Sequence, residues 1–323
     1  MKNKVLFIIP YFGKFKNYFQ LFLNSCHFNK DFNWLIITDD RSIYTYPKNV
    51  RVVYKSFNDL KMEFQSKFPF KLGLEKPYKL CDFRPAYGYL FNEYLSGYDF
   101  WGYCDTDLIF GNLREFINDN VLNTYDKIGV LGHLTLIRNK KETNEAFMLP
   151  LNNKSRYIDV FRSNTNYSFD EEFKESINSI FEEYNFKIFD QINDANIYTK
   201  SSNFKITKLV DKPNKYNIES KTRSFFLFDN GKLNRFFAKN GKMYSESYSY
   251  LHMQSRKMKT NVSQTSYLFK IIPNSFDPVE RYPITTIRDF NCIKLKHFNL
   301  HYFTLRTMNL VDKIRNRINK GRY

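Results

Sequence analysis

The chain has 323 residues, with 50 Lys and Arg against 33 Asp and Glu, and a formal net charge of +17 at pH 7. A hydrophobic share of 42% and an aromatic share of 19% exclude a disordered chain. The length suits one large domain, or one domain with a smaller appendage. The basic residues are spread along most of the chain, so the charge permits an anionic partner without identifying one.

No segment has the pattern of an export signal or a membrane span. The apolar core at residues 5–9 ends at Pro10 and is too short for a secretory signal, and no apolar run approaches the length of a membrane span. The cysteines show no metal-binding or redox spacing and are typical of reduced thiols: Cys26, Cys81, Cys104 and Cys292. We therefore expect a cytoplasmic protein.

The first 54 residues alternate between strand and helix patterns. Apolar runs at residues 5–9, 34–37 and 50–54 predict buried strands. The apolar residues between the first two runs recur at helical spacing, namely Phe15, Phe19, Phe22 and Cys26. This order predicts a parallel α/β sheet, with residues 10–13 and 38–40 at the carboxyl edge of its strands.

A fourth buried strand, at residues 98–104, ends in Asp105-Thr106-Asp107. Residues i and i+2 of an extended chain point the same way, so both carboxylates would face one spot at the ligand-binding edge of the sheet. They would repel each other unless a cation lay between them, and Mg²⁺ or Mn²⁺ completed by substrate phosphates is the simplest choice. The alternative is a strand-to-helix turn in which the aspartates cap the helix.

The middle of the chain continues the mixed pattern. We expect a helix after Pro85, another over residues 113–121, and one strand over residues 128–138. Residues 139–166 are polar and are predicted to be an irregular surface excursion. Ser168 with Glu171 three residues later matches a capping box, which predicts a helix from about residue 168 to 184.

From residue 223 the period changes to that of strands. Runs at 224–228, 233–237 and 243–250, separated by two Asn-Gly turns, predict an antiparallel meander. The meander leads to His252, followed by Arg256 and Lys257. A metal-bound diphosphate would use a further neutral ligand and nearby cations, although a lone histidine at a strand end is more often a surface or core residue.

Several short motifs occur together in one order. They are Pro10-Tyr11-Phe12-Gly13, Thr38-Asp39, Lys79-Leu80-Cys81-Asp82-Phe83-Arg84-Pro85-Ala86-Tyr87-Gly88, Trp101-Gly102-Tyr103-Cys104-Asp105-Thr106-Asp107, Gly132-His133-Leu134-Thr135-Leu136-Ile137-Arg138-Asn139 and His252-x-Gln254-x-Arg256-Lys257-Met258. In combination, over roughly residues 1–260, they resemble a family of bacterial glycosyltransferase-like proteins with a GT-A fold, found in capsule and lipopolysaccharide biosynthesis.

The resemblance implies a nucleotide-sugar donor, usually a uridine diphosphate sugar, and Mn²⁺ or Mg²⁺ on the D-x-D motif. It implies metal ligation by Asp105, Asp107 and His252, with Asp105 also near the donor sugar or ribose. Donor contacts would come from Pro10, Tyr11, Phe12, Gly13, Asp39, Lys79, Asp82, Arg256 and Lys257, with His133 in the sugar or acceptor wall. The acceptor would be an oligosaccharide or a lipid-linked glycan.

An inverting transfer also needs a carboxylate to take the proton of the acceptor hydroxyl. Asp170 and Glu171 are the candidates by position, and Asp170 is favoured because Glu171 is expected to cap a helix. The opposing interpretation makes both of them acidic first-turn residues of that helix.

Three other functions compete with this hypothesis. A sugar nucleotidyltransferase would carry a Gly-rich loop after the first strand, where this chain has a single glycine. A nucleic-acid binder would fit the charge, but no nucleic-acid motif supports it and we expect no such partner. The third alternative is a relative that binds carbohydrate or nucleotide without catalysis.

The predicted fold class is therefore α/β, with a GT-A-like Rossmann-type, mostly parallel sheet flanked by helices, a C-terminal antiparallel β-meander and a basic helical tail. We expect residues 1–260 to form the catalytic domain, including the meander at 223–250, and residues 261–323 to form an extension. The tail mixes apolar residues with basic ones: Leu305, Met308, Leu310, Val311 and Ile314 with Arg306, Lys313, Arg315, Arg317, Lys320 and Arg322. Such a helix predicts peripheral contact with the inner face of an anionic membrane, the alternative being a helix packed on the catalytic domain.

Overall fold

The computed structural model describes residues 2–171, 173–198, 204–211, 215–220 and 222–297, and in the tail 300, 303–304, 306–308, 310–311 and 314–315. Its main sheet has the strand order β3-β2-β1-β4-β7-β6-β8 within the described residues. The strands are β1 (Val5–Tyr11), β2 (Phe32–Thr38), β3 (Val50–Tyr54), β4 (Phe100–Cys104), β6 (Lys127–Ile128), β7 (Leu134–Arg138) and β8 (Ile188–Phe189). Strands β3, β2, β1 and β4 run parallel, and β7 lies antiparallel to β4.

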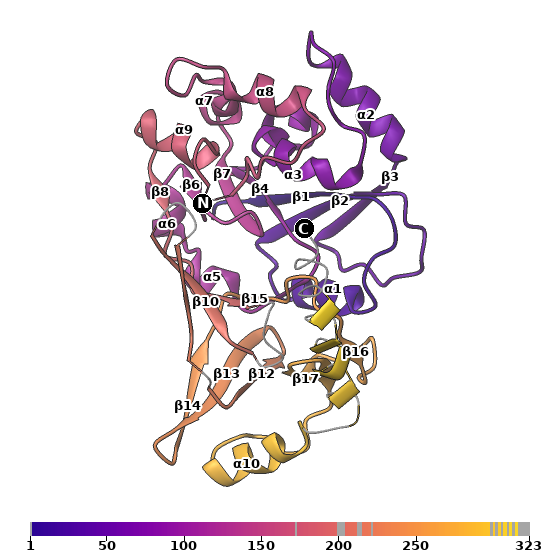
Figure 1. Cartoon of the computed structure of the whole chain (residues 1–323), viewed down its shortest axis with the longest axis vertical. Coiled ribbons are helices and arrows are strands. Elements are labelled where there is room, and N and C mark those ends of the chain that lie inside the picture. Colours follow the sequence, from indigo (N-terminus) through magenta and orange to yellow (C-terminus); the bar gives the residue numbers. More distant parts are fainter. Residues whose placement is uncertain are drawn as a thin grey trace.

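Helices cover both faces of this sheet (Figure 1). On one face, Leu60, Phe83 and Phe161 belong to a buried cluster with the sheet residues Ile8 and Trp101. The helices there are α2 (Phe57–Ser66), α3 (Leu80–Phe83), α4 (Tyr87–Leu90), α7 (Lys141–Asn144), α8 (Arg156–Arg162) and α9 (Ile177–Glu183). The other face is covered by α1 (Phe19–His27), α5 (Leu113–Phe116) and α6 (Asp119–Thr124).

A second sheet crosses the carboxyl edge of the first. Its order is β11-β10-β9-β15-β5, with β5 (Leu108–Phe110), β9 (Asp194–Ile197), β10 (Ile206–Asp211), β11 (Lys215–Ile218) and β15 (Tyr250–His252). Strand β5 follows β4 after three residues, and β15 lies between β5 and β9 with His252 opposite Leu108 and Asn196. The second sheet therefore brings residue 252 next to the end of β4.

The third sheet contains the predicted meander and is drawn in orange and yellow in Figure 1. Its order is β14-β13-β12-β17-β18-β16, with β12 (Ser224–Asp229), β13 (Lys232–Lys239), β14 (Lys242–Ser247), β16 (Lys259–Thr260), β17 (Leu268–Ile272) and β18 (Ser275–Asp277). Asn230 and Gly231 both have positive φ angles, of 45° and 87°, as the predicted tight turn requires. Helix α10 (Ile287–Leu295) packs Phe290 and Ile293 against this sheet.

The predicted fold class is confirmed as a mixed α/β architecture with a mostly parallel sheet flanked by helices and C-terminal antiparallel strands. Strands β17 and β18 follow residue 260 but belong to the same sheet as β12. The division of the chain at residue 260 stays a prediction. None of the described helices combines the length and apolar character needed to cross a bilayer.

Five local predictions are wrong. The helix expected over residues 113–121 is divided into α5 and α6. The single strand over residues 128–138 is an antiparallel pair, β6 and β7, because Gly129 turns the chain with a φ angle of 86°. The helix from residue 168 does not form there; α9 starts at Ile177 and is capped by Ser176, whose hydroxyl accepts from the Asn178 N–H. Residues 139–166, predicted to be irregular, contain α7 and α8. The strand predicted over residues 243–250 is divided between β14 and β15, and β15 belongs to the second sheet.

The described residues of the tail are helical in conformation. The apolar ones are exposed, namely Leu300, Phe303, Met308, Leu310, Val311 and Ile314. The predicted tail residues Leu305, Lys313, Arg317, Lys320 and Arg322 lie outside the described residues.

Candidate metal and nucleotide site

A cleft of about 630 Å³ opens at the carboxyl ends of β1 and β4. These strands are parallel neighbours, so the segments after them meet at one edge, where α/β proteins bind their ligands. Eight of the predicted site residues line the cleft: Pro10, Tyr11, Phe12, Asp105, Asp107, His133, Glu171 and His252.

Asp105, Asp107 and His252 form a cluster with the donor set of a divalent-metal site. One ligand atom from each lies within 4.8 Å of the other two. His252 Nε2 is 3.4 Å from Asp107 Oδ1 and 3.5 Å from Asp105 Oδ2. Two carboxylates and one imidazole suit Mn²⁺, and Mg²⁺ would use the carboxylates with substrate phosphates.

Asn196 fixes the orientation of His252. Its Oδ1 is 3.1 Å from His252 Nδ1 and also accepts a hydrogen bond from Gln254 Nε2 at 2.5 Å. An amide oxygen can only accept, so His252 carries its proton on Nδ1, and the lone pair of Nε2 faces the two carboxylates. The orientation of His252 is therefore compatible with ligation of a metal through Nε2.

The pKa values of the cluster indicate a site that favours a bound cation. Burial acts to raise the pKa of Asp107, but His252 and the Ser255 N–H outweigh it and lower that pKa to about 2. Burial likewise acts to lower the pKa of His252, and the charges of Asp107 and Asp105 raise it. The two carboxylates therefore favour a positive charge at this position, and a divalent metal would supply it.

Arg84 links the cluster to the opposite wall of the cleft. Its guanidinium lies 2.5 Å from Asp105 Oδ1 and 2.9 Å from Asp170 Oδ2, and it donates to the Gly132 carbonyl at 2.8 Å. Arg84 is a site residue that was not predicted from the sequence, although it lies inside the motif over residues 79–88. It holds Asp105 in place and shares its charge between two carboxylates.

The two candidate bases occupy different positions. Asp170 is fully buried beside Arg84 and does not line the cleft, and burial raises its pKa to about 6 although Arg84 opposes the shift. Glu171 does line the cleft. The helix cap expected of Glu171 does not exist, because α9 begins at Ile177. The position of Glu171 suits a base for an acceptor hydroxyl better than that of Asp170.

Lys79 and Asp82 do not reach the cleft. They form a buried ion pair with 2.7 Å between Lys79 Nζ and Asp82 Oδ2. The Asp82 carboxylate also accepts the backbone N–H groups of Tyr167 and Phe169, at 2.9 Å each. The structure thus gives this pair a supporting position, in which it holds the loop that carries Asp170 and Glu171.

The remaining predicted donor contacts lie at or beyond the rim. The Gly13 N–H donates to Asp39 Oδ1 at 2.8 Å, next to Phe12 of the cleft. Arg256 donates hydrogen bonds to the carbonyls of Pro273 and Tyr198 and does not line the cleft. Lys257 is exposed and does not line the cleft. Sequence reasoning also missed these lining residues: Lys16, Tyr78, Asn196, Tyr216, Gln254 and Ser255.

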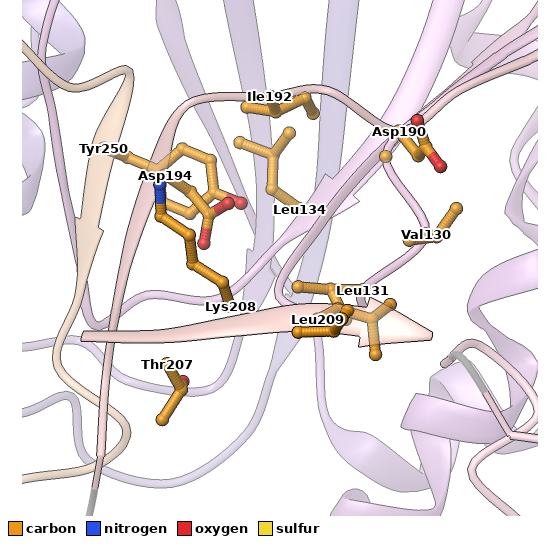
Figure 2. A pocket seen from close by; sticks show the side chains of 12 residues that line it. Val130, Leu131, Leu134, Asp190, Ile192, Asp194, Thr207, Lys208, Leu209 and Tyr250 are labelled. Atoms are coloured by element: carbon orange, nitrogen blue, oxygen red, sulfur yellow. The ribbon is translucent and has the colours of Figure 1, made fainter. Parts of the chain in front are cut away.

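A second, smaller cavity of about 240 Å³ lies beside the cleft (Figure 2). Leu131 lines both the cleft and this cavity. Tyr250 lines the cavity, and its hydroxyl lies 3.2 Å from Nδ1 of His133, which lines the cleft. Figure 2 shows the Lys208 side chain extending toward Asp194. Burial raises the pKa of Asp194 to about 6.

The fold and the cluster together define an α/β protein with a candidate divalent-metal site at the carboxyl edge of its sheet. Residues 7–280 match the family of unknown function DUF6625, and the chain belongs to that family. No curated protein matches it.

Solved structures that are similar to the chain include two of LgtC. One is the galactosyltransferase LgtC in complex with donor and acceptor sugar analogues, and the other is an active-site mutant of LgtC. Each is 12% identical over 60% of this chain, with a TM-score of 0.34, and the matches cover 75% and 74% of the LgtC chains. At this level the similarity gives no evidence of activity, which has to come from the side chains of the cleft.

Proposed function

We propose that the chain is a metal-dependent glycosyltransferase that uses a nucleoside diphosphate sugar, with uridine as the favoured nucleoside. The observation that carries the proposal is the cluster of Asp105, Asp107 and His252 at the mouth of a 630 Å³ cleft. Such a cluster can hold a cation that binds a diphosphate, and a cleft of this volume suits a nucleotide sugar.

Asp105, Asp107 and His252 would hold Mn²⁺ or Mg²⁺, which when bound offsets the negative charge that develops on the leaving diphosphate. Lys16 also lines the cleft and brings a positive charge to the same region. Pro10, Tyr11 and Phe12, at the end of β1, would pack against the nucleoside. Arg84 keeps Asp105 oriented through their ion pair.

The transfer exchanges one bond at the anomeric carbon for another. The bond between that carbon and the phosphate oxygen breaks, and its electron pair leaves with the nucleoside diphosphate. The acceptor hydroxyl oxygen forms the new bond and gives up its proton. In an inverting reaction Glu171 would take that proton, since it lines the cleft while Asp170 is buried.

The resemblance in the motifs supports a wider context. We propose an oligosaccharide or lipid-linked acceptor from capsule or lipopolysaccharide synthesis, used in the cytoplasm at the inner face of the membrane. The exposed Phe303, Leu310 and Ile314 would enter the interface, assisted by the basic tail. Cosedimentation with anionic liposomes should decline after truncation behind residue 302; equal binding of both proteins would exclude the tail as an anchor.

The function is tested by measuring UDP release from a panel of UDP-sugars with and without Mn²⁺. Wild type should release UDP from at least one donor only when Mn²⁺ is present, and Asp107→Asn should lose this activity because it removes a metal ligand. Asp159→Asn, an exposed carboxylate on α8, is the matched control and should keep full activity. Mn²⁺-dependent binding of a UDP-sugar without release would identify a non-catalytic relative.

A further inference from the structure

One polar atom at the cleft has no hydrogen-bond partner among the described residues. His133 lines the cleft with 8% of its surface exposed, and its Nε2 atom is buried and unpaired. A buried nitrogen without a partner costs free energy, so a site that retains one commonly uses it on a ligand.

The proton on this ring can be placed from its other nitrogen. His133 Nδ1 lies 3.2 Å from the Tyr250 hydroxyl, and within the described part of the chain this hydroxyl makes no other hydrogen bond. A phenol has one hydrogen to donate. If Nδ1 accepts that hydrogen, both groups are satisfied, and the histidine proton resides on Nε2.

The unpaired N–H would lie beside the metal cluster. The His133 and His252 rings are 4.3 Å apart between centroids, and the His133 carbonyl accepts the Asp105 N–H at 3.0 Å. A ligand bound at the cluster would thus come within reach of His133 Nε2. A neutral N–H donor matches a phosphate oxygen or a sugar hydroxyl.

We propose that Tyr250 holds His133 in the Nε2–H tautomer, so that His133 donates a hydrogen bond to an oxygen of the bound sugar nucleotide. The proposal rests on the proposed function and gives His133 a defined role in it. Tyr250, which contacts no substrate in this scheme, is a positioning residue. The acceptor oxygen belongs either to the diphosphate or to the transferred sugar.

Two amide substitutions distinguish the roles of the two ring nitrogens of His133. Glutamine places its amide near the position of Nε2 and can keep the donor, whereas asparagine reaches only the position of Nδ1. His133→Asn should weaken the binding of the UDP-sugar with Mn²⁺ about tenfold, as expected for one lost hydrogen bond, and His133→Gln should stay close to wild type. Equal losses in both variants would contradict the proposal.

Binding of UDP itself distinguishes the two acceptors. If the partner is the diphosphate, His133→Asn weakens UDP and UDP-sugar equally; if it is the sugar, UDP binding with Mn²⁺ is unchanged. Tyr250→Phe should cause a smaller loss than His133→Asn, because the ring keeps its donor but loses the partner that selects the tautomer. Thermal unfolding of each variant shows whether it is folded.

The tautomer can also be measured without any substrate. Nitrogen-15 NMR of histidine-labelled wild-type protein should show a protonated Nε2 and an unprotonated Nδ1 for His133, with the signal assigned from its absence in His133→Gln. A proton on Nδ1 would mean that Tyr250 donates elsewhere, for example toward Asp194 across the small cavity, and would overturn the proposal. This result is independent of catalysis, so its failure is distinct from failure of the proposed function.

Discussion

The two walls of the cleft are built in different ways. One wall consists of strand ends: β4 leads to Asp105 and Asp107, and β15, which pairs with β5, ends at His252. The other wall, the loop wall, includes Glu171, which belongs with Asp170 to the loop between α8 and α9; the described residues of that loop, 163–171 and 173–176, form no helix or strand. Hydrogen bonds of the sheets hold the first wall, and buried ion pairs hold the second.

Substitutions in the two walls should therefore affect different properties of the protein. A strand end keeps its place through many backbone hydrogen bonds, so substituting a side chain there alters the ligand site more than the fold. The loop depends on a few desolvated charges, and removing one partner leaves the other buried without compensation. Stability experiments should therefore identify the loop wall, and ligand experiments the strand wall.

The largest expected effect is on the loop wall. Asp82→Ala would leave Lys79 buried without its counter-ion and free the two backbone N–H groups that Asp82 accepts. We expect the free energy of unfolding to fall by about 3–5 kcal/mol in urea titrations. Glu75→Gln, which breaks an exposed pair with Lys61, is the control and should lower the free energy of unfolding far less. A loss that small for Asp82→Ala would mean that the pair does not hold the loop.

The second effect is a pH dependence that belongs to the same wall. Burial raises the pKa of Asp170 to about 6, so between its unfolded value of 3.8 and 6 the folded protein binds the proton more tightly than the unfolded chain. Its contribution to stability is therefore full below pH 3.8 and is lost as the pH rises through 6, a change of about 3 kcal/mol. Asp170→Asn should flatten the urea stability curve over that range. An unaltered slope would place the pKa near its ordinary value.

The third effect concerns the strand wall. Asn196→Ala removes the acceptor that fixes the His252 ring, and loss of such an outer partner typically weakens metal affinity 10- to 100-fold. Mn²⁺ titration should show this loss with a change in unfolding free energy much smaller than that of Asp82→Ala. Unchanged Mn²⁺ affinity would show that Asn196 does not orient His252 as a ligand.

The same contrast explains how far the sequence could lead. Buried strands are recognisable in a sequence as apolar runs. For this reason it was possible to predict β1 to β4 and the two carboxylates after β4. The meander was predictable from its Asn-Gly turns. The residues around position 252 suggested His252 as a candidate ligand, and the resemblance supported it. Its proximity to Asp107 was not predictable, because it depends on the pairing of β15 with β5.

The conformation of the loop wall could not be predicted from the sequence, for a physical reason. Ser168 and Glu171 fit a capping box, but the buried charges of Lys79, Asp82 and Arg84 hold this segment in another conformation. Ser168 itself has a φ angle of 51°, which a helix cap would not have. Contacts between residues more than 80 positions apart override a local pattern, and no periodicity in the sequence reveals them.

The central claim is that Asp105, Asp107 and His252 hold a divalent cation that binds a nucleoside diphosphate. Electron paramagnetic resonance of free Mn²⁺, titrated with the full chain in the presence of UDP, measures this directly. We predict one Mn²⁺ bound per wild-type chain, and its loss in both Asp107→Asn and His252→Ala, each checked for folding by thermal denaturation. Equal Mn²⁺ binding by wild type and these variants, or none by wild type, would contradict the account.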